Sequence, residues 1–279
     1  MNNKLEIMKK TKAFVGKCKS LLSDLFYKEN KKLISENKLK ANDYIKEAMV
    51  KISEFTEDYV DLEKIEELDI SYKFMSNGEV RKNLSKKVGG YSNIGGNVIG
   101  MDYDDFNVIK IIMIHEGLHF VSSEVIKGKR EKIEDGVEEI ITSDIYLCGV
   151  STTVFNLNNN NSDDYYIYSY KGLNEIITEY FTKVILGDDY VNYESKYFAG
   201  VMFLERLVKE NILDIDLLKE AYFKHNPELI VSCLSDYFVE NEIENLFNYL
   251  ISDDVNVMLE TYNNTNKVLD KRKSNLRRG

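Results

Sequence analysis

The sequence predicts an α+β fold, in which a small antiparallel sheet is followed by a mostly helical lobe. Two observations carry this prediction. Before residue 100, short stretches rich in β-branched and aromatic residues, such as Ile70–Phe74, alternate with glycine-rich stretches. From about Asp105 onwards, apolar residues recur at spacings of three and four, which is the period of an amphipathic helix.

By composition the 279 residues divide into four segments. Residues 1–41 form a basic N-terminal segment, and residues 42–128 are expected to hold the sheet and an apolar helix. Residues 129–266 are expected to form the helical lobe, and residues 267–279 a basic tail.

The first predicted helix spans Leu5–Phe26. Its apolar residues recur mostly at spacings of three and four, and lysines occupy the outer face. Its pattern fits a helix docked on the protein body, a helix on an anionic membrane surface or a helix that binds a partner. The sequence does not choose between these roles. A second helix is predicted near residues 42–57.

Residues 89–99 are predicted to form two short strands around a glycine-rich turn, because paired glycines supply the positive φ of tight hairpins. The stretch lacks the Gly-Lys-Ser/Thr ending of a P-loop, so it does not predict a phosphate site. Beyond it we expect a polar loop at Asn156–Asp164. The helices expected after the hairpin span 105–127, 131–147, 172–186, 193–210, 214–223, 227–240 and 242–262.

Composition excludes several classes of protein. No stretch approaches 18 apolar residues, and the N-terminus lacks the apolar core of a signal peptide. The cysteines, Cys18, Cys148 and Cys233, are odd in number and widely spaced, which argues against a disulfide framework or a thiolate metal site. We therefore expect a soluble protein of the reducing cytoplasm.

The net charge of −10 is unevenly distributed. Residues 1–40 carry +7 and residues 267–279 carry +5, which leaves −22 on the residues between them. An acidic body repels nucleic acid, so we expect no nucleic-acid partner. The basic ends leave contact with a membrane surface open.

The most informative motif is H-E-x-x-H, formed by His115, Glu116 and His119 within an apolar helical stretch. At 3.6 residues per turn, positions 115 and 119 lie about 40° apart, so both imidazoles leave one face of the helix and can bind one ion. Glu116 lies about 100° away, where it reaches a water held by that ion. Because buried polar groups need partners, the motif favours a metal site over a solvated stripe.

A catalytic zinc site usually takes a third protein ligand. The residues after His119 lack the Gly and third His of metzincins. Further on, Gly172-Leu173-Asn174-Glu175-Ile176-Ile177-Thr178-Glu179 resembles the G-x-N-E-x-x-S-D helix of thermolysin-like gluzincins, with Thr for Ser and Glu for Asp. Two glutamates at i and i+4 are by themselves typical of a solvated helix stripe. Their pairing with an upstream H-E-x-x-H favours the metal site instead.

The resemblance implies a zincin-like fold and one Zn²⁺ per chain, held by His115, His119 and Glu175. It implies that Glu179 accepts a hydrogen bond from His115, and that Asn174 supports the ligands from outside the metal's own coordination. Glu116 would be the general base in the hydrolysis of a peptide or protein substrate. The 55 residues between His119 and Glu175 exceed the spacing of thermolysin, which affects the expected cleft more than the metal.

The same resemblance points to residues that contact the substrate. Thermolysin-like enzymes place a tyrosine shortly before the ligand Glu, and a later histidine, beside the developing oxyanion. The candidates are Tyr166, Tyr168, Tyr170 and His225. An extended substrate would pair with an edge strand at about Asn97–Tyr103, with Asn97, Val98 and Ile99 as its contacts.

The alternative is a non-catalytic, zincin-like protein that binds metal or a partner protein for regulation. Glu116 argues against it, because a structural zinc site has no use for a base. A closed structural site would also need a fourth Cys or His near the cluster, and the sequence shows none.

Overall fold

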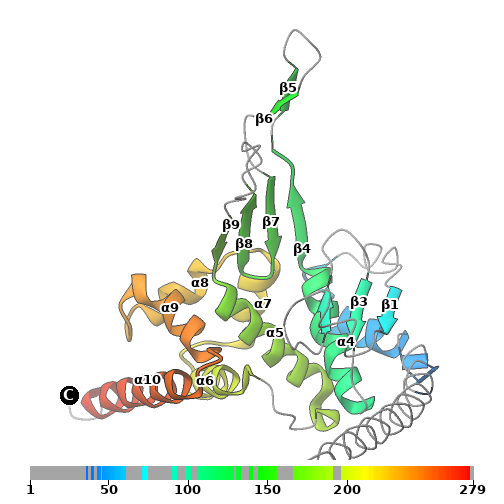
Figure 1. Cartoon of the computed structure of the whole chain (residues 1–279). Coiled ribbons are helices and arrows are strands. Elements are labelled where there is room, and N and C mark those ends of the chain that lie inside the picture. The colour runs from blue at the N-terminus through cyan, green and yellow to red at the C-terminus, as the bar shows by residue number, and fades with distance from the viewer. Residues whose placement is uncertain are drawn as a thin grey trace, which may run out of the picture.

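The structure is a computed structural model (Figure 1). It describes residues 36, 39–40, 43–44, 46–60, 71–74, 90–92, 98–101, 106–128, 130–132, 138–140, 144–155, 166–190 and 196–276. The predicted helix at Leu5–Phe26 and the Asn156–Asp164 loop lie outside these residues.

A three-stranded sheet precedes the first long helix. Its strands are β1 (Ser71–Phe74), β2 (Gly90–Ser92) and β3 (Val98–Met101), in the order β1-β3-β2. The antiparallel pairing of β2 with β3 confirms the predicted hairpin, and β1 joins β3 in parallel. Because β1 occupies the other side of β3, Val98 and Ile99 lie in a central strand. The prediction of an edge strand there is therefore wrong, and Asn97 lies outside the described residues.

The H-E-x-x-H segment lies in α4 (Phe106–Val121), which is apolar on nearly every side and correspondingly buried. The helix ends at Val121 rather than at the predicted residue 127, because Ser123–Ile126 forms strand β4. The helix predicted near 42–57 is present at residues 43–44 and 46–56, and the described residues 36 and 39–40 before it are helical as well. This helix packs closely on α4, since a Cβ at Gly117 would come within 2.5 Å of the Ile52 side chain.

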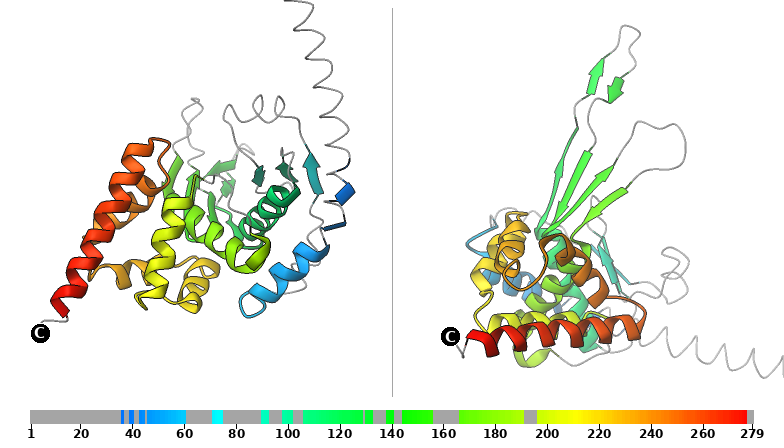
Figure 2. Two further views of the ribbon diagram at one scale, coloured as in Figure 1. Left: turned by 90° about the horizontal axis from the view of Figure 1, so that it is seen from below. Right: turned by 90° about the vertical axis from the view of Figure 1, so that its left-hand side faces the viewer.

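The prediction of a helix at 131–147 is wrong. The described residues there form strands β5 (Arg130–Lys132), β6 (Glu138–Ile140) and β7 (Asp144–Cys148). β5 pairs with β6, while β7 joins β4, β8 (Ser151–Phe155) and β9 (Tyr166–Ser169) in an antiparallel sheet of order β4-β7-β8-β9. Val125 and Ile126 of β4 pair with Tyr146 and Ile145, and such β-branched and aromatic pairs favour strands. This sheet projects from the helical body (Figure 2).

The rest of the described chain is helical, as the α+β prediction requires. Its elements are α5 (Lys171–Leu186), the 3₁₀ turn η1 (Gly187–Asp189), α6 (Phe198–Lys209), α7 (Ile215–Phe223), α8 (Glu228–Leu234), α9 (Glu240–Leu250) and α10 (Val255–Leu276).

Three of the predicted helix boundaries need correction. The helix predicted at 193–210 begins at Phe198, and the one predicted at 227–240 ends at Leu234. The helix predicted at 242–262 is two helices, since α9 ends at Leu250 and α10 begins at Val255. At the start of α10, the Asp254 side chain accepts a hydrogen bond from the backbone N–H of Asn256. The predicted basic tail is helical up to Leu276.

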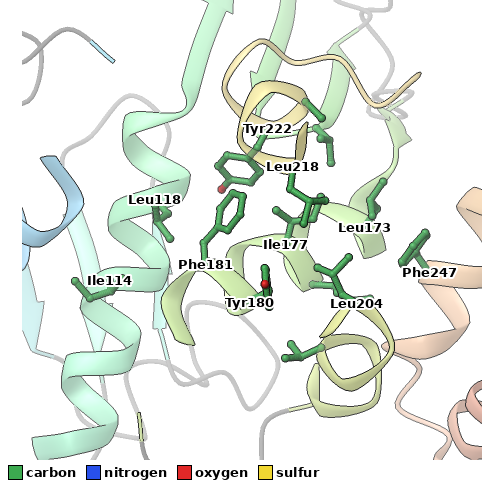
Figure 3. Close-up of a cluster of buried hydrophobic side chains, with 14 of the residues drawn as sticks. Ile114, Leu118, Leu173, Ile177, Tyr180, Phe181, Leu204, Leu218, Tyr222 and Phe247 are labelled. Carbon is green, nitrogen blue, oxygen red and sulfur yellow. The ribbon is translucent and has the colours of Figure 1, made fainter. Parts of the chain in front are cut away.

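Helix α5 lies at the centre of the helical part and packs against α4, α6 and α9. Its apolar face, which includes Leu173, Ile177 and Phe181, is fully buried in a cluster shared with the neighbouring helices (Figure 3). The ring of Phe181 contacts those of Phe55 and Tyr222. The core thus holds α5 rigidly beside α4.

Among the described residues, no helix is both long and apolar enough to cross a membrane.

We predict that Phe181→Ala lowers the free energy of unfolding by about 3–5 kcal/mol, because it removes a fully buried ring and leaves a cavity. Phe198→Ala is the matched control: the Phe198 side chain is 56% exposed, so we expect a change within about 0.5 kcal/mol. Chemical denaturation of both variants tests this, and equal losses would contradict the assignment of the core.

Candidate metal centre

Two helices that pack side by side carry the residues predicted for the site. Helix α4 carries His115, Glu116 and His119, and α5 carries Asn174, Glu175 and Glu179. Five of these six residues are buried, and Glu175, whose side chain is 20% exposed, is partly buried. His115 and His119 are only 7% and 6% exposed.

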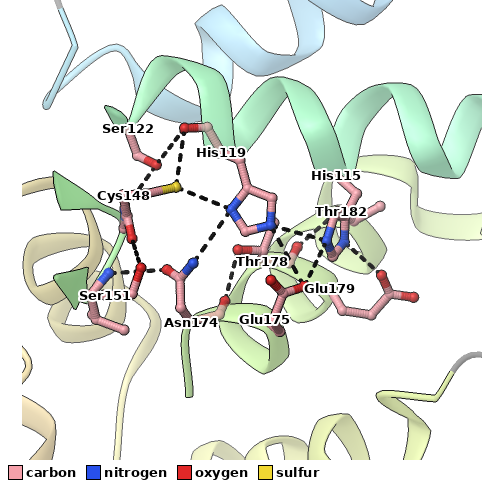
Figure 4. A network of polar contacts seen from close by, with 12 residues as sticks. His115, His119, Ser122, Cys148, Ser151, Asn174, Glu175, Thr178, Glu179 and Thr182 are labelled. Carbon is pink, nitrogen blue, oxygen red and sulfur yellow. Dashed lines mark hydrogen bonds and ion pairs between the residues drawn. The ribbon is translucent and has the colours of Figure 1, made fainter. Parts of the chain in front are cut away.

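His115, His119 and Glu175 meet between the two helices (Figure 4). The Nε2 atoms of the two imidazoles lie 3.2 Å apart. Glu175 Oε2 lies 3.5 Å from His115 Nε2 and 3.8 Å from His119 Nε2. Ligand atoms around a tetrahedral ion at about 2.0–2.2 Å lie about 3.3–3.6 Å from one another. The three observed distances are close to this value, so the His-His-Glu group can hold a metal ion.

Glu179 supports His115 from the side away from Glu175. Its Oε2 accepts a hydrogen bond of 2.8 Å from His115 Nδ1–H, and its Oε1 accepts one of 2.7 Å from the Tyr190 hydroxyl. Glu179 is fully buried, so both of its oxygens need such donors. A carboxylate behind an imidazole fixes the ring's tautomer and orientation, which leaves Nε2 free to bind a metal.

His119 has different neighbours at its Nδ1 atom. Cys148 Sγ lies 3.4 Å from it, and Asn174 Nδ2 lies 3.5 Å from it. The side-chain oxygen of Asn174 accepts a 3.1 Å hydrogen bond from the backbone N–H of Val150. This bond orients the amide so that its NH₂ group faces His119. Asn174 therefore reaches the site, but its acceptor atom holds the turn between β7 and β8.

The buried groups strongly affect one another's protonation. Burial by itself lowers the pKa of His115, but hydrogen bonds to Glu175 and Glu179 outweigh it and raise the pKa to about 9. Burial likewise raises the pKa of Glu175, but His115 and His119 bring it well below its ordinary value. The carboxylates thus favour protonation of the imidazoles, so protons and a metal ion would compete for the same nitrogen atoms.

The structure also places Glu116 and Tyr197 at this site. Glu116 is 9% exposed and follows His115 directly in α4. The ring of Tyr197 stacks on that of His115, with centroids 5.6 Å apart and planes at 9°. Burial, and then the nearby Glu175 and Glu116 carboxylates, raise the pKa of the Tyr197 hydroxyl. A neutral hydrogen-bond donor therefore lies beside the His-His-Glu group.

The tyrosines and the histidine suggested by sequence lie elsewhere or have other partners. Tyr166 and Tyr168 belong to β9, an outer strand of the projecting sheet. The Tyr170 hydroxyl donates to Glu228 at 3.3 Å. His225 Nδ1–H donates to the Gly149 carbonyl at 2.7 Å, and its Nε2 lies 3.8 Å from Glu124. These contacts involve none of the side chains of the His-His-Glu group.

Sequence reasoning missed Tyr197, Tyr190 and Cys148. The two tyrosines follow Glu175 in the chain, whereas the family pattern directs attention to tyrosines before it. Cys148 follows directly on a segment predicted to be helical. One signal could have found it: Gly149 separates two stretches rich in β-branched and aromatic residues, which is typical of a hairpin.

The two glutamates of α5 should respond differently to the same substitution. We predict that Glu175→Gln loses the bound metal on mild dialysis, because a direct ligand is removed. Glu179→Gln should keep the metal with about 10–100-fold weaker affinity, because only the support of His115 is weakened. Metal titrations that rank the two variants in the opposite order would show that their roles are exchanged.

Comparison of the chain with protein-family models, with curated proteins and with solved structures gave no match. The chemistry of the site is therefore inferred from its own residues and distances.

Proposed function

We propose that this protein is a zinc-dependent peptidase of the gluzincin type, with a zincin-like arrangement of its two site helices. The observation that carries the proposal is the convergence of His115 Nε2, His119 Nε2 and Glu175 Oε2 between α4 and α5. Two imidazoles and one carboxylate are the ligand set of catalytic zinc sites that keep a position for water.

The donor set also supports zinc over other ions. Calcium and magnesium prefer sites made of oxygen ligands, whereas imidazole suits zinc and other transition metals. When bound, zinc would lower the pKa of a water molecule and polarise the carbonyl group of the substrate. We therefore assign one Zn²⁺ to His115, His119 and Glu175.

Glu116 is proposed as the general base. It follows a ligand directly on the same helix, so its carboxylate leaves α4 about 100° from His115, too far round to join the imidazoles as a ligand. A carboxylate there can accept a proton from the attacking water and pass it to the leaving amine of a peptide bond. A site that served structure alone would have no use for such a group.

Tyr197 is proposed to stabilise the oxyanion, in place of the tyrosines suggested by sequence. Its raised pKa keeps the hydroxyl protonated, so that it can donate a hydrogen bond to a negatively charged oxygen. Stacking on His115 holds its ring beside the ligands. A hydrogen bond to Glu175 and the charges of Glu175 and Glu116 contribute to this raised pKa, so the hydroxyl lies near both carboxylates.

The proposed substrate is a peptide or protein in an extended conformation. Since β3 is paired on both sides, a substrate strand can add to this sheet at an outer strand, β1 or β2. Of the two, β2 packs against α4, and we propose it as the docking edge.

Glu116→Gln should keep about one zinc per chain and the parent fold, but lower peptide hydrolysis at least about a hundredfold, because the water loses its base. Elemental analysis and a broad peptide library measure the two quantities, with His115→Ala and His119→Ala as zinc-depleted controls. A parent that takes up no zinc would refute the proposal. A parent that binds zinc but hydrolyses no peptide would favour a non-catalytic, metal-binding regulatory protein.

Tyr197→Phe should retain zinc, because the ring that stacks on His115 is preserved. We expect it to lower kcat by about 10²–10³-fold through loss of one oxyanion donor. Tyr249→Phe is the matched control, since the Tyr249 side chain is 52% exposed and lies in α9 away from the site. Unchanged kcat in Tyr197→Phe would exclude this tyrosine from the reaction.

A further inference from the structure

We propose that Cys148 is a positioning residue of the metal site: its Sγ atom accepts the hydrogen bond from His119 Nδ1–H and so holds the imidazole with Nε2 towards the metal. This inference rests on the proposed function, because it requires a metal bound by His119. The proposed peptidase mechanism assigns no other role to this thiol.

The fold brings Cys148 to His119 through the projecting sheet. Helix α4 ends at Val121 and the chain continues directly into β4, whose first residue, Ser123, pairs with Cys148 at the end of β7. Strand pairing therefore places Cys148 beside the last turn of α4, which carries His119. Figure 4 shows the sulfur atom next to the imidazole ring.

The turn that follows Cys148 is fixed against α5. Gly149 has φ 53°, which favours glycine, and a Cβ there would lie 2.0 Å from Asn174 Oδ1 and 2.3 Å from the Tyr222 ring. The backbone N–H of Val150 donates to the same Asn174 oxygen, and the N–H of Gly149 donates to Ser122 Oγ at 3.1 Å. Cys148 thus stands on a rigid turn, as a positioning group must.

Hydrogen-bond chemistry then assigns the partner of His119. When Nε2 binds a metal, Nδ1 carries the proton and needs an acceptor. Of its two described neighbours, Asn174 presents Nδ2, which is itself a donor, whereas a thiol sulfur is a weak acceptor. The S–H of Cys148 has its own acceptor in the His119 carbonyl at 3.5 Å. Cys148 can therefore both accept a hydrogen bond from His119 and donate one to it.

The two imidazoles are consequently held by unlike partners. His115 has the Glu179 carboxylate at 2.8 Å, whereas His119 has the Cys148 sulfur at 3.4 Å. Outer partners of this kind typically change metal affinity by about 10–100-fold. The contribution of Cys148 should therefore be measurable without any assay of catalysis.

The test is the zinc affinity of the full-length protein, measured by competition with a chromogenic chelator. We expect Cys148→Ala to bind zinc at least about tenfold more weakly than the parent. Cys148→Ser should recover affinity to within about threefold, because a hydroxyl can also accept from Nδ1–H and donate to a carbonyl. Cys233→Ser is the matched control, since Cys233 is the other free cysteine among the described residues and lies in α8.

Several outcomes would overturn the assignment. One is Cys148→Ala affinity within about twofold of the parent, and another is equal weakening in the Ala and Ser variants. A sulfur-to-metal charge-transfer band in the Co²⁺-loaded parent would make Cys148 a ligand rather than a supporter. A parent that binds neither Zn²⁺ nor Co²⁺ would refute the proposed function and this role together, whereas failure of the Cys148 variants alone would leave the function standing.

Discussion

The close packing of α4 against α5 is the contact on which the candidate metal centre depends. It buries the two imidazoles and Glu179 and partly buries Glu175, in surroundings where an unpaired polar group would be costly. Each side chain of the cluster is accordingly matched by another. Among the described residues, the Tyr44 hydroxyl is the one buried side-chain group without a hydrogen-bond partner, and it lies outside this cluster. The apolar core around Phe181 keeps the two helices in place and thus maintains the alignment of the ligands.

The two sides of the centre are built by different parts of the fold. His115 is supported within the helical body, by Glu179 and through it by Tyr190. His119 is supported by the projecting sheet, whose first strand continues from α4 and whose β7–β8 turn rests on Asn174. The projecting sheet therefore contributes to the site, because one of its turns helps to position a proposed zinc ligand.

Prediction from the sequence succeeded where a local pattern specified the secondary structure, and failed where contacts between distant segments specified it. The helical character of α4 and α5 and the β2–β3 hairpin could be predicted from spacing and from glycines. The strands β6 and β7 were missed, because their apolar spacing is also compatible with a helix, and pairing of β6 with β5 and of β7 with β4 decides between the two. Tyr197 was missed for a related reason: its place beside His115 depends on how the chain returns from α5 to α6.

The sequence by itself determined which side chains share a helix face: His115 with His119, and Glu175 with Glu179. The reason is that a helix repeats every 3.6 residues wherever it lies in the protein. The resemblance implied separate roles for Glu175 and Glu179, but only the tertiary structure decided that these two faces meet and that Cys148 and Tyr197 lie beside the imidazoles. These relations join segments tens of residues apart, so they follow from core packing and strand register, which no local period encodes.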